Sequence, residues 1–67
     1  MYRLSMLLTG DVEIFDYKEL VFALVEIYKD LETAGFLADL LRRLANFYED
    51  EHEFFIKDEI YIEKIAE

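Results

Sequence analysis

The stretch Phe-Asp-Tyr-Lys-Glu-Leu at residues 15–20 carries the strongest local structural signal in the sequence. Asp16 is a favourable N-cap residue, and Glu19, three positions later, completes a capping box. Phe15 precedes the cap and Leu20 occupies the fourth helical position, which is the spacing of a hydrophobic staple. The pattern therefore predicts a helix that begins directly after the cap.

This first helix is expected to cover residues 17–34, because its apolar side chains recur three and four residues apart. They are Tyr17, Leu20, Leu24, Ile27, Tyr28 and Leu31. Gly35 follows as the expected left-handed residue beyond the helix, and Phe36 is expected to fold back onto Leu31 as in a Schellman ending.

A second helix is expected over residues 37–52 or longer. Its apolar stripe consists of Leu37, Leu40, Leu41, Leu44, Phe47 and Tyr48. The connection through Gly35 is so short that the two helices should be antiparallel neighbours. The predicted fold class is therefore all-α: an antiparallel helical hairpin that pairs into a homo-oligomeric helical bundle, with residues 1–67 forming a single domain.

The C-terminal segment allows two interpretations. Phe54, Tyr61 and Ile65 continue the stripe of the second helix, which favours a helix that reaches about residue 66. The alternative is an α+β fold with a C-terminal β-hairpin, whose strands 53–56 and 59–62 flank Lys57-Asp58. That dipeptide lacks the glycine that tight hairpin turns favour.

Residues 1–14 are equally ambiguous. Leu4, Leu7 and Leu8 fit a short amphipathic helix, whereas Tyr2, Leu4 and Met6 fit a strand. The sequence does not decide between the two.

The charge balance bounds the function. The chain has 16 acidic against 7 basic residues and a net charge of −9. Only Arg42 and Arg43 are adjacent bases, so direct nucleic-acid binding is not expected, and the acidic field favours a basic protein partner.

The longest uninterrupted apolar run, residues 20–25, is too short to span a membrane. The lack of cysteine fits a reducing compartment, and we expect a cytoplasmic protein. The chain has no Gln or Pro and one Asn, which suggests a thermophilic source.

The small size predicts association. A domain of 67 residues is marginally stable alone and is usually reinforced by a disulfide, a metal or a partner. Phe22 lies on the side of the first helix away from Leu20 and Leu24 and gives that helix a second apolar edge. The expected apolar contact residues are Phe22, Val25 and Tyr28, and the expected electrostatic contact residues are Glu49, Asp50, Glu51 and Glu53.

One pattern could hold a metal ion. Glu49 and His52 are three residues apart, as in carboxylate metal sites of helical bundles, and Glu19 could supply a third ligand. On a helical wheel all three side chains point away from the leucine stripe. No metal or other cofactor is therefore expected, and Glu19, Glu49 and His52 are kept as minor candidates.

No nucleophile, base or glycine-rich loop forms a catalytic pattern, so no enzymatic activity is expected. We expect a small acidic protein-interaction module that self-associates through helical-hairpin packing and acts as an adaptor, regulator or inhibitor of a basic partner. The alternatives are a carboxylate/histidine metal-binding bundle and a structural assembly subunit.

Overall fold

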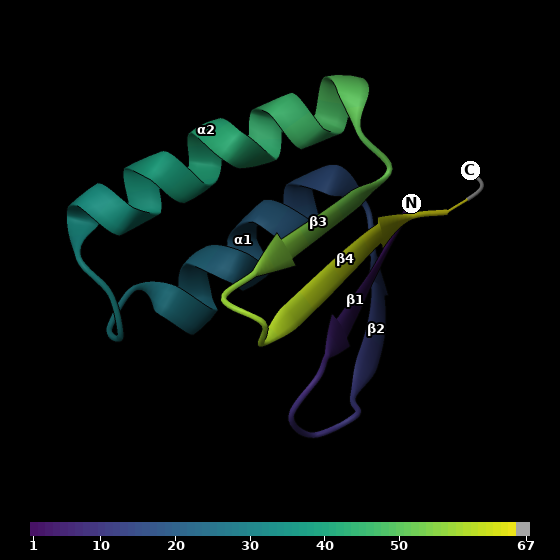
Figure 1. Cartoon of the computed structure of the whole chain (residues 1–67), viewed down its shortest axis with the longest axis horizontal. Coiled ribbons are helices and arrows are strands. Elements are labelled where there is room, and N and C mark those ends of the chain that lie inside the picture. Colours follow the sequence, from purple (N-terminus) through teal and green to yellow (C-terminus); the bar gives the residue numbers. More distant parts are fainter. Residues whose placement is uncertain (66–67) are drawn as a thin grey trace.

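The computed structural model describes residues 1–65, which form two strands, two helices and two further strands (Figure 1). The elements are β1 (Tyr2–Met6), β2 (Val12–Phe15), α1 (Tyr17–Tyr28), α2 (Ala34–Asp50), β3 (Glu53–Ile56) and β4 (Ile60–Lys64). The fold is therefore α+β. The predicted all-α hairpin and the helical bundle built from it are wrong.

The four strands form one antiparallel sheet in the order β2-β1-β4-β3. Two hairpins supply the strands, and the first and last strands of the chain pair in the centre (Figure 1). At the end of this central pair the N–H of Ile65 donates to the carbonyl of Met1 at 3.0 Å. The centre of the sheet thus depends on contacts between opposite ends of the sequence.

The core lies between the helices and one face of the sheet. In each of β1, β3 and β4, alternate side chains point into it, as the two-residue period of a strand requires. α1 lies over the β1–β2 hairpin, and α2 contacts α1 and β3. The buried side chains are Tyr2, Leu4, Leu20, Leu24, Tyr28, Leu40, Leu44, Phe47, Phe54, Ile56, Ile60 and Ile62.

α1 begins at Tyr17 as predicted. The backbone N–H of Glu19 donates to Asp16 at 2.8 Å, and the N–H of Asp16 donates to the Glu19 carboxylate at 3.1 Å. The predicted end of this helix at residue 34 is wrong, because α1 stops at Tyr28 and Leu31 is 71% exposed.

The cause is Thr33, which caps α2 by accepting a hydrogen bond from the N–H of Phe36 at 3.1 Å. Gly35 therefore lies in the first turn of α2 and does not end α1. The ring of Phe36 packs against Tyr28, with centroids 5.4 Å apart, in place of the predicted Schellman contact with Leu31.

The helix predicted to continue past residue 52 is also wrong, because α2 ends at Asp50 and residues 53–64 form the β3–β4 hairpin. Phe54 and Ile62 are buried, whereas Tyr61 points to the opposite face of the sheet. The helical phase of the apolar residues was therefore a coincidence. Lys57 and Asp58 turn the hairpin with φ of 52° and 60°, without a glycine.

The N-terminal segment takes the strand alternative, with Tyr2 and Leu4 in the core. The loop to β2 closes as the N–H of Met6 donates to the carbonyl of Asp11 and the N–H of Gly10 donates to the carbonyl of Met6, both at 2.8 Å. Gly10 has a φ of +83°, a backbone conformation that residues other than glycine rarely adopt.

Candidate protein-binding surface

The face of the sheet opposite the helices is uncovered in the part of the chain that the structure describes. We call it the open face. The strand register places two side chains from each strand on it. They are Arg3, Ser5, Val12, Ile14, Glu53, Phe55, Tyr61 and Glu63.

These side chains form two rows across the strands. The first row is mainly apolar and runs Phe55, Tyr61, Ser5, Val12 from β3 to β2. The second row is mainly charged and runs Glu53, Glu63, Arg3, Ile14. Because residues directly opposite each other in neighbouring strands are in contact, each row is a continuous band.

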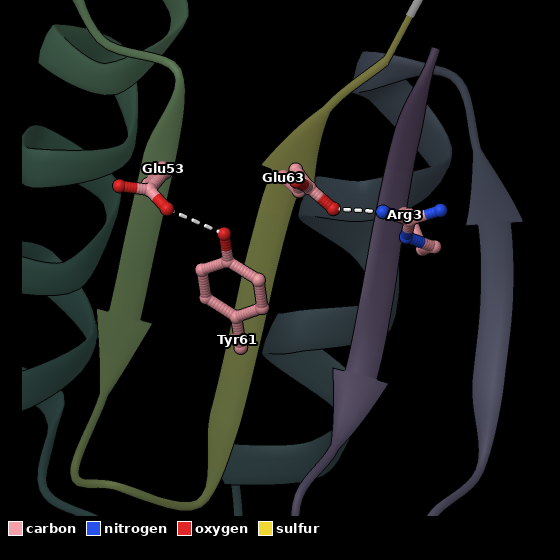
Figure 2. Close-up of polar contacts among 4 residues, drawn as sticks. All are labelled: Arg3, Glu53, Tyr61 and Glu63. Carbon is pink, nitrogen blue, oxygen red and sulfur yellow. Dashed lines mark hydrogen bonds and ion pairs between the residues drawn. The ribbon is translucent and has the colours of Figure 1, made fainter.

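The charged row is held by contacts within the face (Figure 2). The Arg3 guanidinium donates to the Glu63 carboxylate across the central strands. Glu53 lies directly opposite Glu63, and the Tyr61 hydroxyl donates to the Glu53 carboxylate at 2.6 Å. This hydrogen bond raises the pKa of Tyr61 to about 12, because ionisation would lose the donor and place a second negative charge beside Glu53.

Three apolar side chains of the open face are about half exposed. Phe55, Val12 and Ile14 are 53%, 54% and 49% exposed. Phe55 packs against Tyr61 with ring centroids 4.7 Å apart, so part of the apolar surface is already ordered as an aromatic pair. Phe55 and Tyr61 lie toward the β3 edge of the open face, Val12 and Ile14 lie on β2, and Ser5 lies between the two groups. Exposed apolar surface with a polar border is typical of a site for another protein.

The predicted apolar contact residues are not gathered in one place. Phe22 is 63% exposed on the outer side of α1, the side that the helical wheel assigns to it. Val25 is half-buried, and Tyr28 is 3% exposed in the core. Tyr28 therefore stabilises the fold of a single chain, while contact roles for Phe22 and Val25 stay predictions.

The predicted acidic contact residues divide between two places. Glu49 and Asp50 lie in the last turn of α2 and Glu51 is its C-cap, where the negative end of the helix dipole makes acids unfavourable. Glu53 lies on the open face, bonded to Tyr61. The structure thus places Glu53 in the charged row, next to the apolar row of the open face, which the charge pattern alone did not reveal.

The structure brings two of the three minor metal candidates together and leaves the third, Glu19, elsewhere. Glu49 and His52 line one shallow hollow, together with Tyr48 and Lys64. Glu19 is not part of that hollow, because its carboxylate completes the cap of α1. Within residues 1–65 no three His, Asp or Glu side chains are placed to share a metal ion.

Sequence reasoning missed Val12, Ile14, Phe55 and Tyr61 as surface candidates. A partial signal was present at residues 12–14, where apolar Val12 and Ile14 flank Glu13 in the alternation typical of a strand. An all-helical interpretation gives the chain no sheet and therefore hides this surface.

The chain matches no protein-family model, and comparison with curated proteins and with solved structures found no significant match. Neither α1 nor α2 combines the length and apolar character needed to cross a membrane.

Proposed function

We propose that this chain is a small non-enzymatic protein-interaction module of the cytoplasm that pairs with a second copy of itself through the open face. The observation that carries this proposal is the apolar row beside a charged row on an uncovered sheet. Packing two such faces gives a sandwich, a common way for a sheet to bury its second side.

The arrangement of the two rows is complementary to itself. A two-fold axis parallel to the strands, above the centre of the sheet, places β1 over β4 of the second copy and β2 over β3 of the second copy. Arg3 then meets Glu63 of the second copy, Val12 meets Phe55, and Ile14 meets Glu53, whose carboxylate stays bonded to the Tyr61 hydroxyl. Self-complementarity of this kind is what a two-fold interface requires.

The energy of this contact is modest. Fully burying an exposed Val, Ile or Phe is worth about 1.5–3 kcal/mol, so three half-exposed residues per copy supply roughly 4–9 kcal/mol for the pair. Association costs on the order of 4–15 kcal/mol in lost translational and rotational freedom of the two copies. At the most favourable ends of both ranges the surplus is about 5 kcal/mol, so we expect a weak dimer with a dissociation constant of roughly 0.1 mM or weaker.

The test is sedimentation equilibrium of the parent chain, Phe55→Asp and the matched variant Phe22→Asp, up to about 1 mM protein. Both phenylalanines are more than half exposed, so neither substitution opens the core. We expect Phe55→Asp to abolish the dimer and Phe22→Asp to leave it intact. Salt should strengthen the parent dimer, because each copy carries a net charge of −9.

The reverse result would overturn the open-face proposal. A dimer lost in Phe22→Asp and kept in Phe55→Asp would assign the contact to the outer side of α1. A parent chain that stays monomeric throughout the concentration range would leave the module without self-association.

A further inference from the structure

A second feature of the sheet lies at its β2 edge and is distinct from the open face. In the β1–β2 ladder the N–H of Met6 donates to the carbonyl of Asp11. Hydrogen-bonded pairs of an antiparallel ladder recur every second residue, so Glu13 and Phe15 direct their backbone groups toward β1. The N–H and C=O groups of Val12 and Ile14 therefore point outward, where another strand could pair with them.

A hollow of about 640 Å³ lies beside this edge, between β2 and α1. Its apolar lining comes from Leu4, Met6, Val12, Phe15, Ala23 and Ile27. The hollow is on the helix side of the sheet, so alternate side chains of a strand added beside β2 would enter it. The outward backbone groups of β2 and the hollow therefore lie side by side.

The border of the hollow is acidic. Asp11 and Glu13 line it, and no lysine or arginine of the described chain forms an ion pair with either. On α1, Glu19 precedes Ala23 by four residues and Glu26 follows it by three, so both acids neighbour Ala23 on the helix surface. Glu19 completes the helix cap and Glu26 pairs with Lys29 at 3.1 Å, which leaves Glu13 as the carboxylate without a partner.

We infer that the β2 edge binds an extended basic segment of a partner protein, added as a fifth strand in which Lys or Arg alternates with apolar residues. The basic side chain lies opposite Glu13 on the helix side. Its aliphatic stem packs on Ala23 and Ile27, and its charged end reaches the acidic border, as long basic side chains do at apolar surfaces. The apolar residues extend the open face beside Val12 and Ile14.

The same geometry disfavours a second copy at this edge. The symmetric pairing of two β2 strands about Glu13 would place the two Glu13 side chains directly opposite each other. Like charges in that position are destabilising, whereas Glu13 opposite Lys or Arg is a favourable cross-strand pair. Strand addition with alternate side-chain contacts is a known mode of peptide recognition.

The experiment uses a fluorescent heptapeptide in which valine alternates with lysine. Three control peptides accompany it: one with glutamate in place of lysine, one of the same composition with the lysines grouped together, and one N-methylated at alternate backbone nitrogens. Binding is followed by fluorescence anisotropy, and the site by NMR chemical shifts of the Val12 and Ile14 amides. We expect the alternating lysine peptide to bind and to shift these amides, and the three controls to bind more weakly by about tenfold or more.

Charge is separated from position by a pair of protein variants. Glu13→Lys and Glu49→Lys change the net charge equally, but Glu49 is in the last turn of α2, away from β2. We expect Glu13→Lys to weaken binding by about tenfold or more, and Glu49→Lys by less than about threefold. Equal losses in both variants, undiminished binding of the N-methylated peptide, or amide shifts confined to other elements would each overturn the inference.

Discussion

Replacing Asp58 by glycine should stabilise the protein. Lys57 and Asp58 form the turn between β3 and β4 with φ of 52° and 60°. Residues with a side chain pay about 1–2 kcal/mol for this left-handed conformation, and glycine does not. Lys57 is kept because its ammonium pairs with Glu32 and lies 4.8 Å from the centre of the Phe36 ring. Asp58 is exposed and is therefore the position to change.

The expected gain follows from two opposing terms. Relief of the left-handed strain contributes about 1–2 kcal/mol, and the greater freedom of glycine in the unfolded chain removes about 0.4–1 kcal/mol. The net increase in the free energy of unfolding lies between about 0 and 1.6 kcal/mol, with a midpoint of about 0.8 kcal/mol. For a domain of this size the midpoint raises Tm by roughly 3–6 °C.

Urea denaturation followed by circular dichroism, together with thermal melting, measures this change. Asp58→Ala removes the same negative charge but keeps a Cβ atom, so it is the matched control for glycine, and Gly10→Ala is the control for the conformational argument. Gly10 has a φ of +83° with open space around it, so alanine there should cost about 1–2 kcal/mol through backbone strain alone. An Asp58→Gly variant no more stable than Asp58→Ala would refute the assignment of strain to this turn.

Two further predictions concern the core and the open face. Leu44 is 0% exposed, so Leu44→Ala should lower the free energy of unfolding by about 2–5 kcal/mol in a urea titration. Leu41 on the same helix is 38% exposed, so Leu41→Ala should lower it by less than about 1.5 kcal/mol. Similar losses at both positions would contradict the assigned packing of α2. The Tyr61 hydrogen bond should contribute stability that is complete below pH 10 and is lost as the pH rises from 10 toward the folded pKa of about 12, since the folded chain holds that proton more tightly. Glu53→Gln should lower this pKa, which ultraviolet absorbance of tyrosinate detects with Tyr61→Phe as the assignment control; an unchanged titration would remove Glu53 as the cause.

The start of α1 was predictable because its signals are local. The side chains of Asp16 and Glu19 bond to each other's backbone within four consecutive residues. The end of α1 was not, because two local signals competed. Gly35 fits a helix end and Thr33 fits a helix start, and the structure uses Thr33.

The sheet was not predictable because its stabilising contacts are nonlocal. β4 pairs with β1 from the other end of the chain, and the Arg3–Glu63 ion pair spans 60 residues. The apolar residues of 53–65 match a helical stripe and a strand alternation almost equally well, so local periodicity could not decide between them. An acidic interaction module stays a prediction, and its open face requires the sheet to be known.

The acidity of the chain connects the two proposed contacts. Two copies that pair through the open face bring together two net charges of −9, and this repulsion opposes dimer formation. A basic segment at the β2 edge lies in the plane of the sheet and leaves the open face accessible, while its positive charges reduce that repulsion. Binding of the segment and formation of the dimer should therefore favour each other, because coupling between two binding events is reciprocal. The acids near β2 then have two effects: they attract the basic partner, and they keep two copies of the chain apart until the partner is bound.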